Sequence, residues 1–123
     1  MNNKNILIVE DDIVFCKMLN KFLNKNSYLA DDAQTAEEAI EVMQNKHYDI
    51  AIIDYRLPGK NGIELLEWIK DNQKSTKVFM VSRTDDKQIA DKALQLGAKE
   101  YINKPIDPAE LLGKIKSLNT ESV

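Results

Sequence analysis

At 123 residues, with 43% hydrophobic and 30% charged residues, the chain suits one globular domain and is too apolar to be disordered. No apolar run approaches the roughly 20 residues that a membrane span needs, and the polar residues 1–4 lack signal-peptide character. A net charge of −3 and scattered lysines argue against direct nucleic-acid binding. The single cysteine, Cys16, cannot form an internal disulfide, and we expect a cytoplasmic location.

Five short apolar runs are typical of β-strands, and each is followed by a segment in which apolar residues recur at helical spacing. The runs are continuous and mostly β-branched, as in parallel sheets that helices cover on both faces. We therefore expect five βα units with right-handed crossovers in one α/β, doubly wound domain. The second strand is polar enough for a sheet edge. The expected strands are residues 5–10, 27–32, 50–54, 78–82 and 100–103.

Each expected helix has an apolar stripe, and most have a sequence signal near one end. Asp12 is placed to cap the first helix, and Thr35 with Glu38 has capping-box spacing before the second. A turn-rich loop at residues 57–62 precedes the third helix, and we expect Gly97 to end the fourth. The stripes contain, in chain order, Phe15, Met18, Leu19, Phe22 and Leu23; Ala36, Ala39, Ile40 and Met43; Ile63, Leu65, Leu66 and Ile69; Ile89, Ala90, Ala93 and Leu94; and Leu111, Leu112, Ile115 and Leu118.

Polar side chains end three of the apolar runs. Glu10, Asp11 and Asp12 follow the first run, Asp54 ends the third and Ser82 ends the fourth. The carboxyl ends of parallel strands meet at one edge of the sheet, which is where such sheets bind ligands. The sequence therefore predicts a small acidic pocket for a divalent cation and an oxyanion.

The residue types in this pocket suit phosphoryl transfer. Asp54 is a carboxylate nucleophile able to form an aspartyl phosphate, with Mg²⁺ relieving the charge repulsion. We expect Asp11 and Asp54 to bind the metal directly and Glu10 to act through a metal-bound water. Lys104 would pair with one phosphoryl oxygen, and the Ser82 hydroxyl would donate to another. Singly, each residue is more often a cap, a turn residue or a solvated charge, but their convergence favours the functional interpretation.

These motifs, in this order, resemble the receiver domain of bacterial response regulators over about residues 4–118. The resemblance implies a flavodoxin-like sheet in the order 2-1-3-4-5, with Asp54 as the phosphorylated aspartate. It also implies the backbone carbonyl of Arg56 as the third protein ligand of Mg²⁺, for which Mn²⁺ would substitute. Pro58, Gly62 and Pro105 stand at structural positions of the family's pattern.

The resemblance further implies how the domain signals. Ser82 and Tyr101 would form a switch, with Tyr101 exposed before phosphorylation and more buried after it, that changes the surface of the fourth helix, last strand and last helix. A sensor histidine kinase or phosphotransfer protein would be the donor, and an unidentified protein the target. The chain would not be an enzyme on other substrates, nor bind a membrane. We expect residues 1–123 to be a single receiver domain without an output domain, either as a complete regulator or as part of a longer transcription factor or hybrid kinase.

Three residues near the expected site set this chain apart. Arg83 stands where the family usually has a small residue, directly after Ser82. Arg56 and Thr84 occupy the positions that flank the path of an attacking water in the family. We therefore expect an atypical phosphate lifetime, and a several-fold change in autodephosphorylation when Arg83 is replaced by alanine.

Three other functions fit the sequence less well. A phosphate-independent binding module would not need an intact set of acids, aspartate and lysine. An aspartate-nucleophile phosphatase needs a second acid where Arg56 stands. A flavin-binding protein of similar topology needs a phosphate-binding loop after the first strand, where the acids at residues 10–12 would repel a phosphate.

Overall fold

The computed structural model describes residues 4–83 and 87–121. The strands are β1 (Asn5–Val9), β2 (Leu29–Ala33), β3 (Ile50–Asp54), β4 (Lys77–Ser82) and β5 (Glu100–Asn103), and the helices are α1 (Ile13–Lys25), α2 (Ala36–Asn45), α3 (Gly62–Asn72), α4 (Lys87–Gln95) and α5 (Pro108–Glu121). All strand pairs are parallel, and the sheet order is β2-β1-β3-β4-β5. The predicted doubly wound fold and the edge position of the second strand are therefore confirmed.

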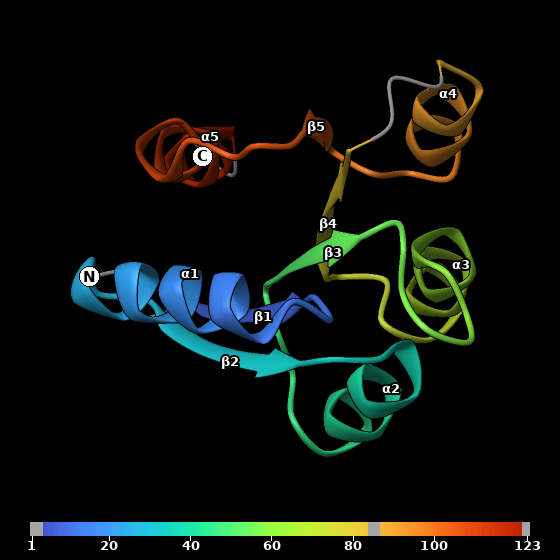
Figure 1. The fold of residues 1–123 in the computed structure, drawn as a ribbon, viewed down its shortest axis with the longest axis horizontal. Coiled ribbons are helices and arrows are strands. Elements are labelled where there is room, and N and C mark those ends of the chain that lie inside the picture. Colours follow the sequence, from blue (N-terminus) through green and yellow to red (C-terminus); the bar gives the residue numbers. More distant parts are fainter. Residues whose placement is uncertain (1–3, 84–86, 122–123) are drawn as a thin grey trace.

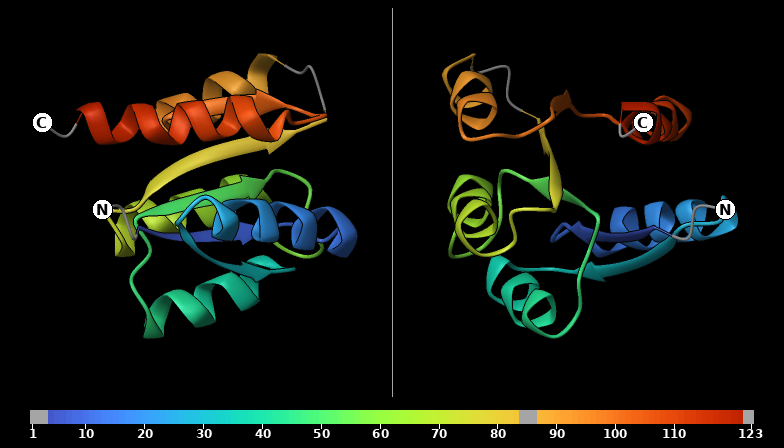
Figure 2. Two further views of the ribbon diagram at one scale, coloured as in Figure 1. Left: turned by 90° about the vertical axis from the view of Figure 1, so that its left-hand side faces the viewer. Right: turned by 180° about the vertical axis from the view of Figure 1, so that it is seen from behind.

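Helices cover both faces of this sheet: α1 and α5 lie on one face, and α2, α3 and α4 lie on the other (Figure 1). Alternate residues of each buried strand pack on opposite faces of the sheet, because successive side chains point to opposite sides. In β1, Ile6 and Ile8 pack with α1 and α5, whereas Leu7 and Val9 pack with α2 and α3. The carboxyl ends of the strands gather at one end of the molecule, and both termini lie at the other (Figure 2).

Two positions predicted for the core lie at the surface instead. The exposed fraction is 51% for Met18 and 47% for Leu94. In α1 the fully buried positions are Cys16, Leu19 and Leu23, so the inner face is rotated from the predicted stripe toward the cysteine. Burial raises the pKa of the Cys16 thiol to about 12, so the thiol stays protonated and unreactive.

Side chains cap the first two helices in different ways. Asp12 Oδ1 accepts a 3.1 Å hydrogen bond from the Phe15 N–H, as predicted. Thr35 Oγ1 accepts from the Glu38 N–H at 3.0 Å, but the Glu38 carboxylate accepts from the Gln34 N–H rather than from that of Thr35. The predicted capping box is therefore only half formed.

A complete capping box begins α3, where the sequence analysis did not place one. The Asn61 side chain accepts from the Glu64 N–H at 3.0 Å, and the Glu64 carboxylate accepts from the Asn61 N–H at 2.9 Å. At the end of α4, Gly97 has a φ of 103°, and the Ala98 N–H donates to the Ala93 carbonyl at 3.0 Å. This left-handed turn ends α4, as predicted from Gly97.

The buried Tyr48 hydroxyl links the edge strand β2 to the segment that leads into β3 through a hydrogen bond. The Tyr48 hydroxyl donates a 2.6 Å hydrogen bond to Asp31 Oδ2, and Lys46 Nζ lies 2.9 Å from the same oxygen. Burial alone would raise the pKa of Asp31, but the hydrogen bonds from Tyr48 and Lys46 outweigh it and hold the pKa below its ordinary value. Ionised Asp31 therefore favours the folded state.

Replacing Tyr48 with phenylalanine should lower the free energy of unfolding at pH 7 by about 1 kcal/mol, because half-exposed Asp31 loses its buried donor. Urea unfolding measures this change. Asp31 stabilises the fold above its unfolded pKa and loses that contribution as pH falls through its lower folded pKa. The difference between Tyr48→Phe and the parent should therefore shrink below about pH 4. An equal difference at pH 7 and at pH 3 would contradict this assignment.

The described part of the chain contains no helix long and apolar enough to cross a membrane.

Candidate functional site

Three acids meet at the carboxyl ends of β1 and β3. Glu10 and Asp11 directly follow β1, and Asp54 is the last residue of β3. Each offers a carboxylate oxygen, and these three oxygens lie within 4.8 Å of one another. Glu10 and Asp54 are buried, whereas Asp11 is exposed. The structure thus brings together the three acids that the sequence predicts for a metal site.

Lys104 enters this cluster from the loop after β5. Its Nζ atom lies 2.6 Å from Glu10 Oε1 and 3.2 Å from Asp54 Oδ2, and only 11% of its side chain is exposed. Burial alone would lower the pKa of Lys104, but the hydrogen bond to Glu10 and the charge of Asp54 outweigh it and raise the pKa. The ammonium group is therefore charged and held between two carboxylates.

Backbone groups fix the two buried acids. Glu10 Oε2 accepts a 3.0 Å hydrogen bond from the Asp12 N–H, so Lys104 and the start of α1 hold its two oxygens. Burial is the main reason that the pKa of Glu10 lies above its ordinary value, although the Lys104 hydrogen bond opposes it. The Arg56 N–H donates a long, 3.4 Å hydrogen bond to Asp54 Oδ1, which places the Arg56 backbone beside the carboxylate.

Gly62 lets the start of α3 pack directly behind Asp54. The Gly62 N–H donates a 2.8 Å hydrogen bond to the Tyr55 carbonyl. A Cβ atom at Gly62 would lie 2.7 Å from the Asp54 carbonyl oxygen, 2.8 Å from Tyr55 Cα and 3.0 Å from Met80 Sδ. Two of these neighbours are backbone atoms that cannot rotate away. Gly62 therefore has a steric role, while Pro58 is exposed in the same loop.

Replacing Gly62 with alanine should lower the free energy of unfolding by about 2 kcal/mol, because the added methyl group overpacks the turn behind Asp54. Gly113→Ala is the matched control, since a Cβ there would meet nothing within 4 Å. Because Gly113 lies in α5, alanine should leave stability unchanged or raise it by up to about 1 kcal/mol. Urea unfolding of both variants measures the contrast. Equal stability of Gly62→Ala and the parent would contradict the steric role.

The two residues predicted to form a switch lie on neighbouring strands. Ser82 is fully buried at the end of β4, where it pairs in register with Asn103. The Lys104 N–H donates a 2.8 Å hydrogen bond to the Ser82 carbonyl, which ties the loop after β5 to β4. Tyr101 is partly buried against the core under α2, α3 and α4, rather than exposed. A change in its environment on phosphorylation stays a prediction.

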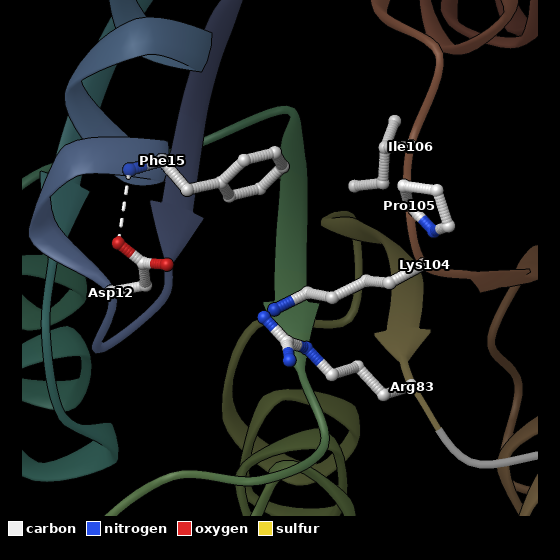
Figure 3. A pocket seen from close by; sticks show the side chains of 6 residues that line it. All are labelled: Asp12, Phe15, Arg83, Lys104, Pro105 and Ile106. Atoms are coloured by element: carbon white, nitrogen blue, oxygen red, sulfur yellow. Dashed lines mark hydrogen bonds between the residues drawn. The ribbon is translucent and has the colours of Figure 1, made fainter.

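A cavity of about 420 Å³ opens beside the acids; we call it the side cavity, and Figure 3 shows its lining residues. The Arg83 side chain extends from the end of β4 toward the tip of Lys104. The ring centroid of Phe15 lies 5.4 Å from Lys104 Nζ, within the range of a cation–π contact. Thr84 lies outside the described residues. The side cavity is lined by Asp12, Phe15, Arg83, Lys104, Pro105 and Ile106.

The sequence analysis did not anticipate the side cavity. It assigned Phe15 to the apolar core stripe of the first helix; Phe15 does pack against the core, but it is only partly buried and also forms the cavity wall. Pro105, expected as a structural residue, follows a cis peptide bond and is exposed at the same wall. A cavity formed by three separate segments has no local sequence signal. The only hint in the sequence was the bulky Arg83, which directly follows a buried strand.

The donor set of the acidic cluster fits Mg²⁺. Carboxylate oxygens are its preferred protein ligands, and opposite ligands of one Mg²⁺ ion lie roughly 4 Å apart. The oxygens of Glu10, Asp11 and Asp54, within 4.8 Å of one another, are close to this spacing.

Comparison with known proteins agrees with this geometry. Residues 6–116 match the family model described as the response regulator receiver domain. Two curated relatives are a cyclic di-GMP phosphodiesterase of Thermotoga maritima, 35% identical over 102 residues, and the transcriptional regulatory protein YvrH of Bacillus subtilis, 34% identical over 120 residues. These matches cover 83% and 95% of this chain but only 27% and 49% of the relatives. The chain thus spans at most about half the length of these curated relatives.

Solved structures show the same fold over nearly the whole chain. A CheY-like receiver domain protein from Methanospirillum hungatei is similar with a TM-score of 0.93 and 33% identity, covering 98% of this chain and 96% of that one. The response regulator TrrA from Thermotoga maritima, solved in complex with Mg²⁺–BeF, has a TM-score of 0.83 and 30% identity, with coverages of 94% and 98%. Together with the family match over residues 6–116, these similarities show that the chain belongs to the receiver domains of response regulators.

Proposed function

We propose that this receiver domain is a phosphorylation-activated switch in which Asp54 accepts a phosphoryl group in a Mg²⁺-dependent reaction. One observation carries the proposal: the buried Asp54 carboxylate lies 3.2 Å from the Lys104 ammonium and shares its pocket with two further acids. A carboxylate that only capped a helix or a turn would not need a buried cation and two acids around it. The arrangement supplies a nucleophile, a cation for the phosphoryl oxygens and a set of metal ligands.

Each residue has a defined part in the proposed reaction. An Asp54 oxygen attacks phosphorus, while Lys104 pairs with a phosphoryl oxygen and the Ser82 hydroxyl donates to another. Glu10, Asp11, Asp54 and the backbone carbonyl of Arg56 would hold Mg²⁺, which neutralises charge on the phosphoryl oxygens when bound. Mn²⁺ should substitute, because oxygen ligands suit both ions. Arg56 is exposed beside this site, and we propose that it alters phosphate lifetime together with Arg83.

The proposed phosphoryl donor is a sensor histidine kinase or a phosphotransfer protein. Three apolar side chains in the first half of α1, the helix that follows Glu10 and Asp11, are exposed: Ile13 by 58%, Val14 by 80% and Met18 by 51%. An exposed apolar patch of this kind is typical of a protein contact surface. Its position supports docking of the donor around α1 and the loop after β5.

The proposed output is a change in the surface formed by α4, β5 and α5. Ser82 ends β4 and Tyr101 lies on β5, so a movement of Ser82 toward the phosphoryl group would reach Tyr101 through paired strands. An unidentified downstream protein would recognise that surface. Residues 1–123 would act as one receiver unit. Because the curated relatives are longer proteins, we also consider an output carried in the same polypeptide, such as a transcription factor.

Intact-mass analysis of the protein with acetyl phosphate tests this function without a partner. With Mg²⁺ we expect the mass of one added phosphoryl group, which hydroxylamine removes because an acyl phosphate is cleaved by it. EDTA should prevent the addition, and Mn²⁺ should restore it. A folded chain that gains no phosphoryl group from small donors or from histidine kinases would favour the phosphate-independent binding module instead.

A further inference from the structure

We propose that the side cavity is a subsite for the leaving group of a small acyl phosphate, and that Arg83 selects donors whose leaving group is a carboxylate. This inference rests on the proposed function, because it concerns the donor that phosphorylates Asp54. It adds a leaving-group subsite and a specificity-determining residue to that reaction. The evidence lies in the charge, the walls and the position of the side cavity.

Two cations reach into the side cavity from neighbouring segments. Figure 3 shows the Arg83 guanidinium and the Lys104 ammonium converging from β4 and from the loop after β5. Lys104 is already engaged by Glu10 and Asp54. In residues 4–83 and 87–118, no carboxylate forms an ion pair with Arg83. Arg83 is therefore available to an anion that enters the side cavity.

The one acid in the lining, Asp12, lies at the start of α1, apart from the Arg83 guanidinium. Asp12 Oδ1 accepts the hydrogen bond from the Phe15 N–H and so caps α1. The remaining lining residues, Phe15, Pro105 and Ile106, form an apolar wall. The side cavity therefore has a cationic end and an apolar side, which suits a small molecule with one anionic group and a hydrocarbon part.

The side cavity also lies beside the proposed nucleophile. Lys104 lines the side cavity, and its Nζ atom lies 3.2 Å from Asp54 Oδ2. A donor that places its phosphoryl group at Asp54 and Lys104 thus has room for its leaving group in the side cavity. The volume of about 420 Å³ lies in the range of small-molecule sites, so an acyl group fits.

The reaction explains why a cation there would select the donor. An Asp54 oxygen forms a bond to phosphorus, and the bond between phosphorus and the acyl oxygen breaks. The bonding electron pair leaves on that oxygen, so an acyl phosphate releases a carboxylate and the total charge is conserved. Negative charge therefore grows on the leaving oxygen in the transition state, where the Arg83 guanidinium can donate charge-assisted hydrogen bonds.

A donor with an amine leaving group lacks this interaction. Phosphoramidate transfers the same phosphoryl group, but its protonated nitrogen leaves as neutral ammonia. No negative charge develops beside Arg83, so the guanidinium gives no advantage. The ratio of the rate constants for the two donors therefore isolates the effect of Arg83 on the leaving group from any effect on Asp54.

The test measures second-order rate constants for phosphorylation by acetyl phosphate and by phosphoramidate, using intact mass and Mg²⁺. We expect the acetyl phosphate to phosphoramidate ratio to fall on the order of tenfold in Arg83→Ala. Arg83→Lys keeps the charge and should restore most of the ratio. Lys70→Ala, which removes an exposed cation of α3, should leave the ratio unchanged. Urea midpoints confirm that the variants fold.

The outcomes separate this inference from the proposed function. A selective loss with acetyl phosphate, restored by Arg83→Lys, supports the inference. Equal changes for both donors, or no change, would overturn it while leaving Asp54 as the acceptor. A native chain that takes a phosphoryl group from neither donor nor from a kinase would overturn the proposed function, and the inference with it.

Discussion

Asp54→Asn should take up no phosphoryl group from any donor, because the amide oxygen is a poor nucleophile compared with a carboxylate. The substitution keeps the size of a side chain that ends a buried strand, so the fold should persist. Intact mass after incubation with acetyl phosphate and Mg²⁺ gives the result directly. We expect a complete loss of the added mass, the largest effect of any single change in this chain.

Asp12→Asn is the matched control for this experiment. Asp12 lies beside the acidic cluster and undergoes the same chemical change, but its side chain caps α1, a role that asparagine also performs well. This variant should still gain one phosphoryl group, because Asp54 is intact. Phosphoryl uptake by Asp54→Asn would show that another residue is the acceptor, and mass mapping of peptides would then identify it.

Lys104→Met should raise the affinity for Mg²⁺ on the order of tenfold, since it removes a positive charge from the metal site. The Lys104 ammonium lies 2.6 Å from Glu10 Oε1 and 3.2 Å from Asp54 Oδ2, so it competes for two of the expected metal-site acids. Methionine retains the length and most of the apolar stem that packs in the pocket. Calorimetric titration with Mg²⁺ measures the change.

The same variant should accept phosphate more slowly, because the phosphoryl oxygens lose their protein cation. Tighter metal binding with slower phosphoryl transfer is a combination that simple damage to the fold would not give. Lys114→Met serves as the control: it removes an ammonium 3.2 Å from Glu100, outside the acidic cluster. An unchanged or weaker Mg²⁺ affinity in Lys104→Met would show that the lysine does not compete with the metal.

Much of the fold follows from local patterns in the sequence. Continuous apolar strands predicted a sheet covered on both faces, and the ends of β1 and β3 correctly placed Glu10, Asp11 and Asp54 together. These predictions succeed because strand periodicity and parallel pairing leave little freedom in where a strand end lies. The family resemblance supplied the sheet order, which spacing alone does not determine.

The errors arose where the outcome depends on helix phase or on distant contacts. A rotation of the inner face of α1 buries Cys16 and exposes Met18, and both residues fit the same apolar pattern. The capping box at Asn61 lies inside a turn-rich loop, which concealed it. Contacts between Lys104 and Phe15, or across the side cavity, join segments far apart in sequence and leave no periodic signal.

The ion pair between Glu10 and Lys104 joins residues that are 94 positions apart, one after the first strand and one after the last. The acids at the ends of β1 and β3 come from the first half of the chain, but their cation arrives only when β5 has joined the sheet beside β4. In the proposed reaction, an unfinished or partly unfolded chain would therefore have Asp54 without the cation that pairs with the phosphoryl oxygens. The proposed phosphorylation thus requires the last strand of the domain as well as the first.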